Sequence, residues 1–124
     1  MFAHPQRFVP KVIEHLEAAQ IPVISAQAAF ARSCPSGDPT DWKKKAFARE
    51  LTGSNINLVS VGDSIFEREA AHFVSQQSCV DLVKTVKFVD SPTIAMLRRQ
   101  LSTLTGQIDT IVAAGRSFDV DMKL

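Results

Sequence analysis

The sequence has 124 residues, 45% of them apolar, and its 14 basic and 13 acidic side chains give a formal net charge of +1. This length predicts one domain over residues 1–124, and the near-neutral charge gives no reason to expect nucleic acid or an anionic membrane as a partner. No stretch approaches the ~20 apolar residues that span a bilayer, and the N-terminus lacks the pattern of a secretory signal. Cys34 and Cys79 are far apart and are expected to be reduced thiols, so we expect an intracellular, cytoplasmic protein.

The first elements predicted are a helix and a short strand. Pro10 suits the first turn of a helix that runs to about residue 20, because proline lacks an N–H that would be unsatisfied there. The apolar face of this helix consists of Val9, Val12, Ile13, Leu16 and Ala19. Residues 23–26 (Val-Ile-Ser-Ala) are short and β-branched enough for a buried strand, and residues 27–33 add a turn of helix.

A loop and a second long helix follow. Residues 34–39 (Cys-Pro-Ser-Gly-Asp-Pro) carry the proline and glycine pattern of a loop. The helix is predicted from about residue 41 to residue 52, with Thr40 or Asp41 as its N-cap and Gly53 just past its end.

The middle of the chain predicts two strands around a helix. Residues 56–61 are almost continuously apolar, as in the central strand of a parallel sheet covered on both faces. Residues 65–77 place apolar side chains at helical spacing, namely Phe66, Ala70, Phe73 and Val74. Residues 83–89 alternate between apolar and polar side chains, which is typical of an edge strand.

A long helix and a short tail complete the pattern. Ser91 and Pro92 suit the N-cap and first position of a helix over residues 92–114, with Gly115 at its end. After it, the alternation of Phe118, Val120 and Met122 predicts an edge strand or a tail. The order of helices and strands predicts an α/β fold of three layers, with a short parallel sheet between helices and a long C-terminal helix.

Asp63 is the strongest candidate for a functional side chain. It follows Gly62 at the end of a predicted strand, and open α/β sheets build their sites at the carboxyl ends of strands. A carboxylate there can coordinate a hard cation such as Mg²⁺; the alternative is that Asp63 and Ser64 only cap the next helix. Glu67 also has two interpretations, because Ser64-x-x-Glu67 has the pattern of a capping box, whereas Glu67 could instead support a metal ion bound by Asp63.

Lys43 is the second candidate. A lysine near a helix start that faces carboxylates can offset the charge of a phosphate; the alternative is a solvated lysine in the run of residues 43–45. The three histidines have no carboxylate or thiol at ligand or relay spacing, so surface or packing roles are expected for His4, His15 and His72. Asp119 and Asp121 do not follow an apolar strand and are not predicted to be a nucleophile motif.

Several segments resemble, in the same order, one eukaryotic group of the haloacid dehalogenase (HAD)-like hydrolases. They are Phe8-Val-Pro-Lys-Val12, Val23-Ile-Ser-Ala26, Trp42-Lys43-x-x-Ala46-Phe47, Val59-Ser-Val-Gly-Asp-Ser64 with Glu67-Arg-Glu-Ala70, Lys84-Thr-Val-Lys-Phe88 and Ser91-Pro92. Together they span nearly the whole chain, although Gln27 stands where the family suggests arginine after Ser-Ala. The resemblance implies that Lys43 corresponds to the family's phosphate-side lysine and Asp63 to its metal-binding acid.

The resemblance covers the C-terminal half of such a HAD-like domain. The family's nucleophilic aspartate ends an apolar strand in an Asp-x-Asp pattern, and this strand and the family's Ser/Thr motif would both precede Met1. Phosphoryl transfer in the family needs that carboxylate as a nucleophile. Mg²⁺ needs several well-placed oxygens, so it is expected to bind weakly to Asp63 alone or with Glu67.

The function expected is therefore that of a non-catalytic HAD-like protein or fragment. One alternative is one half of a Mg²⁺-dependent HAD-type phosphatase whose other half is missing from this sequence. Another is a scaffold or interaction subunit that uses the helix over residues 92–114. Because the family's first strand would lie beside residues 56–61, we also expect an open sheet edge at which the chain self-associates or binds a partner chain.

Overall fold

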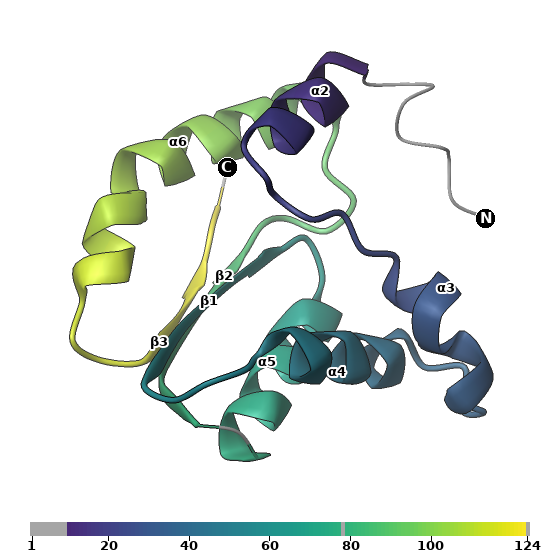
Figure 1. Ribbon diagram of the computed structural model, residues 1–124. Coiled ribbons are helices and arrows are strands. Elements are labelled where there is room, and N and C mark those ends of the chain that lie inside the picture. Colours follow the sequence, from purple (N-terminus) through teal and green to yellow (C-terminus); the bar gives the residue numbers. More distant parts are fainter. Residues whose placement is uncertain (1–9, 78, 124) are drawn as a thin grey trace.

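Three parallel strands form the centre of the computed structural model, which describes residues 10–77 and 79–123 (Figure 1). The strands are β1 (Ile56–Gly62), β2 (Val80–Lys87) and β3 (Phe118–Asp121), and they lie in the order β1-β2-β3. β1 pairs with β2 and β2 pairs with β3, both in parallel. The chain is thus α/β with helices around a short parallel sheet, as predicted, and the arrangement is compatible with a Rossmann-like fold.

Helices cover both faces of this sheet (Figure 1). α5 (Ile65–Gln77) packs on β1 and β2, and α4 (Pro39–Glu50) packs on α5. The small side chains that α5 buries let it lie close to the strands: Ala70, Ala71 and Val74. α6 (Ile94–Ala113) lies on the other side of the sheet, which gives the three layers expected from the sequence.

The predicted strand over residues 23–26 is wrong. Residues 21–25 adopt no regular secondary structure, and α3 (Ala26–Phe30) begins where the strand was expected to end. The Ser25 hydroxyl accepts a hydrogen bond from the Ala28 N–H at 3.2 Å and so caps α3, and the residues before it pair with no strand of the described sheet. The short 3-10 helix η1 (Ala31–Ser33) follows, so the predicted turn of helix over residues 27–33 is confirmed.

Two strands exchange the positions that were predicted for them. β1 is an edge strand of the described sheet and not its central strand, and β2 is central and not at the edge. The physical cause is β3, the predicted edge strand near the C-terminus, which adds to the far side of β2. Two polar residues in the middle of β2, Lys84 and Thr85, are fully buried.

Two helices begin at residues other than those predicted. Asp38 caps α4 by accepting from the Thr40 N–H at 2.9 Å, so Pro39 is the first helical residue and neither Thr40 nor Asp41 is the cap. Thr93 caps α6 by accepting from the Met96 N–H at 3.1 Å. Ser91 cannot be the α6 cap, because its φ of +46° belongs to a left-handed turn before the helix.

The first helix is present but its apolar face is not part of the core. α2 (Pro10–Ala18) has no buried residue, and Val12 is 52% exposed. The predicted contribution of Val9, and the resemblance at Phe8, lie outside the described residues. None of the described helices is both long and apolar enough to cross a membrane.

A buried lysine fixes α6 to the sheet. The Lys84 ammonium on β2 donates to the carbonyls of Val112 at 3.0 Å and Ala114 at 2.5 Å, at the C-terminal end of α6. These carbonyls have no partner within a helix, and the negative end of the helix dipole favours a cation there. Asn57 on β1 adds a third bond, from its Nδ2 to the Val112 carbonyl at 2.9 Å.

Candidate functional site

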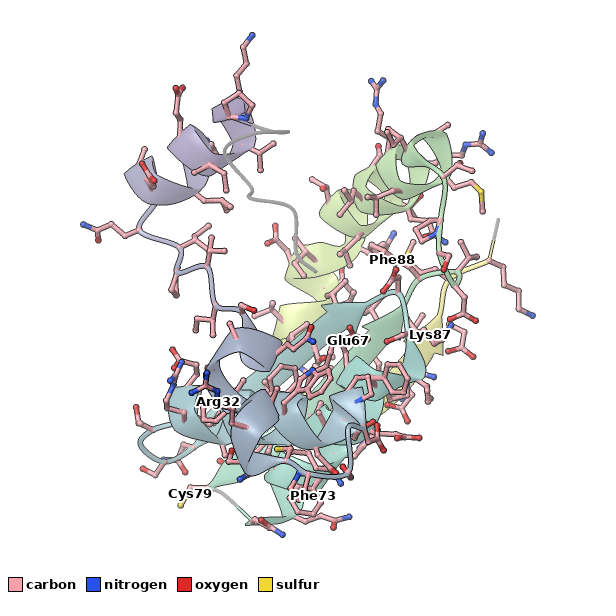
Figure 2. All side chains as sticks on the ribbon, turned by 90° about the vertical axis from the view of Figure 1, so that its right-hand side faces the viewer. Arg32, Glu67, Phe73, Cys79, Lys87 and Phe88 are labelled. Atoms are coloured by element: carbon pink, nitrogen blue, oxygen red, sulfur yellow. The ribbon has the colours of Figure 1, made fainter. Side chains whose placement is uncertain are left out.

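The candidate site lies at the carboxyl end of β1. Gly62 ends this strand, Asp63 and Ser64 form the turn, and α5 begins at Ile65. Glu67 therefore stands in the first turn of α5, at the same end of the sheet as Lys87 and far from Cys79 (Figure 2). Open α/β sheets present their functional groups at this edge.

An ion pair between two helices dominates this site. The Lys43 Nζ on α4 lies 2.5 Å from Oε1 of Glu67, and the Ser64 hydroxyl donates to Oε2 of the same carboxylate. The Lys43 and Glu67 side chains are 27% and 17% exposed, so the pair is only partly screened by solvent. Each oxygen of Glu67 thus has a donor within the protein.

Half of the predicted capping box is present. The Ser64 Oγ accepts from the Phe66 N–H at 3.3 Å, as an N-cap side chain does. The Glu67 carboxylate, however, accepts from the Ser64 hydroxyl and from Lys43. In the reciprocal capping box it would accept from the Ser64 N–H. The sequence could not show this difference, because Lys43 reaches Glu67 only through the packing of α4 on α5.

Glu67 is held in its charged form. Burial of the carboxyl acts to raise the pKa of Glu67, but the hydrogen bonds from Lys43 and Ser64 and the positive charge of Lys43 outweigh it. The pKa of Glu67 is therefore below its ordinary value. At neutral pH the pair is a carboxylate and an ammonium that neutralise each other.

Gly62 makes room for the Glu67 side chain. A Cβ atom added to Gly62 would lie 2.6 Å from Cγ and 2.8 Å from Cβ of Glu67. Real Cβ atoms essentially never come so close to another heavy atom. Glycine at the end of β1 is thus required by the approach of Glu67 to the strand, a role that adds to the Gly-Asp pattern seen in the sequence.

The structure gathers the three predicted site residues around one cleft. The cleft has a volume of about 370 Å³, and its walls include Lys43, Asp63 and Glu67 together with Trp42 and Asp90. Asp63 is exposed. Lys43 comes from the second turn of α4, since that helix begins at Pro39 and not at residue 41. Trp42, the sole tryptophan of the sequence, places an aromatic ring on the wall of this cleft.

A Mg²⁺ ion does not fit this set of donors. Both oxygens of Glu67 are engaged by Lys43 and Ser64, and Asp90 pairs with Lys87 at 3.0 Å. Across residues 10–77 and 79–123, no three His, Cys, Asp or Glu side chains are close enough to hold one metal ion. Asp63 alone supplies too few of the oxygens that Mg²⁺ requires.

A second polar cluster, which was not predicted, lies on the β3 side of β2, whereas the candidate site lies at β1. Arg68 of α5 donates to the Thr85 hydroxyl at 2.8 Å and to the Val120 carbonyl at 2.8 Å, and it pairs with Asp121 at 2.6 Å. The His72 Nε2 lies 2.8 Å from Oδ1 of Asp119. The cluster therefore fastens β3 to α5 and β2.

The carboxylate of Asp119 is stabilised within this second cluster. Burial acts to raise the pKa of Asp119, but hydrogen bonds with Thr85 and His72 and the charges of His72 and Arg68 lower it below its ordinary value. Two spacings in the sequence could have suggested the cluster. Arg68 and His72 are one helical turn apart, and Asp119 and Asp121 share one face of a strand.

Comparison of the chain with models of protein families, with curated proteins and with solved structures gave no match.

Proposed function

We propose that this chain is a non-catalytic HAD-like protein or fragment, whose β1 edge is available to another chain. The proposal combines the sequence resemblance with the state of the site. Lys43 and Asp63, the two residues for which the resemblance implies roles, line one cleft with Glu67 at the carboxyl end of β1. Among the described residues, no Asp-x-Asp pair lines this cleft, and no three His, Cys, Asp or Glu side chains come together as a metal site.

The observation that carries the proposal is the location of the Asp-x-Asp pair in the fold. The sequence contains this pattern once, at Asp119 and Asp121. Both residues lie on β3, which β2 separates from β1. Their carboxylates are bound by Arg68 and His72. Neither aspartate lines the cleft, so the one Asp-x-Asp pair of the sequence is not beside Lys43.

Two specific observations favour the alternatives. The free edge of β1 would suit one half of a Mg²⁺-dependent phosphatase that receives the nucleophile strand from a separate polypeptide. The exposed apolar side chains of α6 would suit a scaffold subunit, because Ile94 is 81% and Leu101 46% exposed. The first alternative predicts activity only after the missing strand is supplied, and the second predicts none.

Turnover of an aryl phosphate tests the proposal. The purified chain is incubated with p-nitrophenyl phosphate and Mg²⁺, beside the matched variants Asp63→Asn and Asp119→Asn. We expect all three to release nitrophenol at the rate of buffer alone. Saturable turnover that Asp63→Asn abolishes would overturn the proposal, and turnover that Asp119→Asn abolishes would identify β3 as the source of a nucleophile.

A further inference from the structure

The N-terminal arm, defined as residues 10–25, is hardly packed against the rest of the chain. α2 has no buried residue and makes no extensive contact with any other described element. The segment after it exposes three β-branched side chains, with Ile21 at 50%, Val23 at 61% and Ile24 at 38%. Exposed apolar side chains that follow one another in this way are typical of segments that contact a partner.

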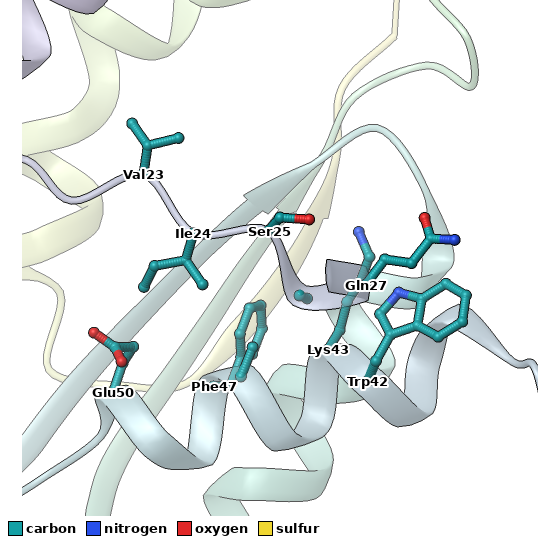
Figure 3. Close-up of a pocket in the computed structure, with 10 residues that line it drawn as sticks. Val23, Ile24, Ser25, Gln27, Trp42, Lys43, Phe47 and Glu50 are labelled. Carbon is teal, nitrogen blue, oxygen red and sulfur yellow. The ribbon is translucent and has the colours of Figure 1, made fainter. Parts of the chain in front are cut away.

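The backbone of this arm also lacks partners. No backbone N–H or carbonyl of residues 22–24 forms a hydrogen bond with another described residue. Val23 and Ile24 point in opposite directions, as successive side chains of a strand do (Figure 3). Gln20, just before the segment, has a φ of +58°, which is uncommon for a residue other than glycine. The segment has the composition and the local geometry of a strand but no sheet to join.

The described sheet has a free edge at β1, where a further strand could pair. β1 pairs with β2 alone in the described sheet, so its outer N–H and carbonyl groups are unpaired. Neither β1 nor residues 20–26 contains a charged side chain, so pairing between them would bury no charge. Val61 on β1 is 37% exposed, as expected for an edge strand without its neighbour.

Two spaces, one on each side of the last turns of α4, lie between the arm and this edge within one chain. A space of about 530 Å³ lies between residues 23–27 and α4 (Figure 3). A second space of about 280 Å³ lies between the end of α4 and β1. Phe47 and Glu50 of α4 line both spaces. In its own chain the arm joins the fold beside α4 and not beside β1, because Ser25 caps α3 and α3 packs on α4.

The geometry points to an arm-exchanged dimer in which residues 21–25 of each copy pair with β1 of the other copy. This inference rests on the binding role of the β1 edge in the proposed function and names a second copy of this chain as the partner. Ser25, the cap of α3, joins this segment to the rest of its own chain, and reciprocal pairing of one identical element between two copies gives a closed, two-fold assembly. Each copy would gain main-chain hydrogen bonds at β1 and would cover Ile24 and Val61.

Cross-linking of single-cysteine variants tests which segments meet. In a Cys79→Ser background, which removes the exposed native thiol while Cys34 stays buried, one copy carries Val23→Cys and the other Val59→Cys. Because the two changes are on different molecules, a short bismaleimide can join Val23 to Val59 only between copies. We expect this mixed cross-link and a concentration-dependent dimer in sedimentation experiments over the micromolar range. The inference would be overturned if the chain stays monomeric. It would also be overturned if cross-links form only between two copies that both carry Val59→Cys.

A charge in the arm provides a second test that does not depend on cross-linking. Ile24 is exposed in the single chain, so Ile24→Asp should leave the fold intact. It should weaken dimerisation by at least about tenfold, because an unpaired carboxylate would lose its water at the new interface. Lys11→Asp, on α2, is the matched control and should leave the dimerisation constant unchanged. Equal dimerisation of both variants would contradict the inference, whereas a monomer without phosphatase activity would leave the proposed function in place.

Discussion

At the scale of single residues, Glu67 and its neighbours decide what the cleft can do. A lysine and a carboxylate that could separately face a phosphate and a metal ion instead face each other, at 2.5 Å. The pair is partly buried, so loss of either partner leaves a charge in an unfavourable environment. If a further carboxylate or a metal ion lay between Lys43 and Glu67, the lysine would be able to face a phosphate and the carboxylate to face the metal ion.

Replacement of Lys43 should show how much this ion pair contributes to the free energy of unfolding. In Lys43→Met the Glu67 carboxylate keeps its burial but loses its cation, so the pKa of Glu67 should rise and the free energy of unfolding at neutral pH should fall by about 1–3 kcal/mol. Lys45→Met is the control, since the Lys45 ammonium donates at the surface to the Ser33 carbonyl. Urea unfolding of both variants measures the difference, and an equal loss would show that the ion pair contributes nothing.

Two glycines should respond in opposite directions to the same substitution. Gly62→Ala forces Glu67 away from β1 and should lower the free energy of unfolding by about 1–3 kcal/mol. Gly106→Ala should raise it by about 1 kcal/mol, because Gly106 is inside α6 and an added Cβ meets no atom within 4 Å. Thermal melts compare the two, and a Gly62→Ala protein as stable as the original chain would contradict the close approach of Glu67.

Acid should weaken the fold through two carboxylates. The pKa values of Glu67 and Asp119 are both lowered in the folded chain, so the unfolded chain binds more protons in acid. Their contribution to stability is present above the ordinary carboxyl pKa and is lost as the pH falls through the lowered values. The double variant Glu67→Gln, Asp119→Asn should therefore lose less stability than the original chain between about pH 6 and pH 3. The free energy of unfolding of both proteins is measured by urea unfolding at each pH. If it falls equally steeply with decreasing pH in the two proteins, these two carboxylates are not the origin of the acid sensitivity.

At the scale of elements, regular patterns could be predicted and positions in the sheet could not. The Gly-Asp pattern correctly places the end of β1 and the start of α5, because turn and capping chemistry act between neighbouring residues. The predicted strand over residues 23–26 fails for the opposite reason, since a strand depends on a neighbour that no local pattern supplies. The exchange of central and edge positions between β1 and β2 likewise follows from where β3 pairs.

Lys84 illustrates what alternation cannot reveal about a site. In the sequence it is one polar position of a strand whose alternation suggests one solvated face. In the structure it is fully buried, and its ammonium donates hydrogen bonds to carbonyls at the C-terminal end of α6. The cluster around Asp119 is similar, because its members are far apart in the sequence and meet only in the fold. Lys43, Asp63 and Glu67, by contrast, could be placed together because each is near the start of a helix at the same sheet edge.

The contact of Lys84 with α6 should be visible in hydrogen exchange. In Lys84→Met the carbonyls of Val112 and Ala114 lose a charged donor, so amides in the last turn of α6 should exchange about tenfold faster or more. Lys87→Met is the matched control on the same strand, because Lys87 pairs with Asp90 outside α6. Unchanged protection of the last turn in Lys84→Met would mean that other contacts hold this end of the helix.

At the scale of the whole molecule, a three-stranded sheet supports two polar sites of different character. The cluster around Asp119 fastens one edge strand, whereas the other edge, β1, has no neighbour in the described sheet. The cleft with Lys43 and Glu67 lies at the carboxyl end of that open strand. The architecture thus combines a cleft in which Lys43 and Glu67 pair with each other and an edge strand whose outer backbone groups are unpaired in the described sheet.

The fluorescence of Trp42 tests most directly whether the cleft is closed to a metal ion and a phosphate. Trp42 is the sole tryptophan and lines the cleft, so its emission reports binding there without a label. Titration with MgCl₂ and then with inorganic phosphate, up to millimolar concentrations, should leave the spectrum unchanged in the original chain and in Asp63→Asn. A saturable change in the original chain that Asp63→Asn removes would contradict the mutual neutralisation of Lys43 and Glu67.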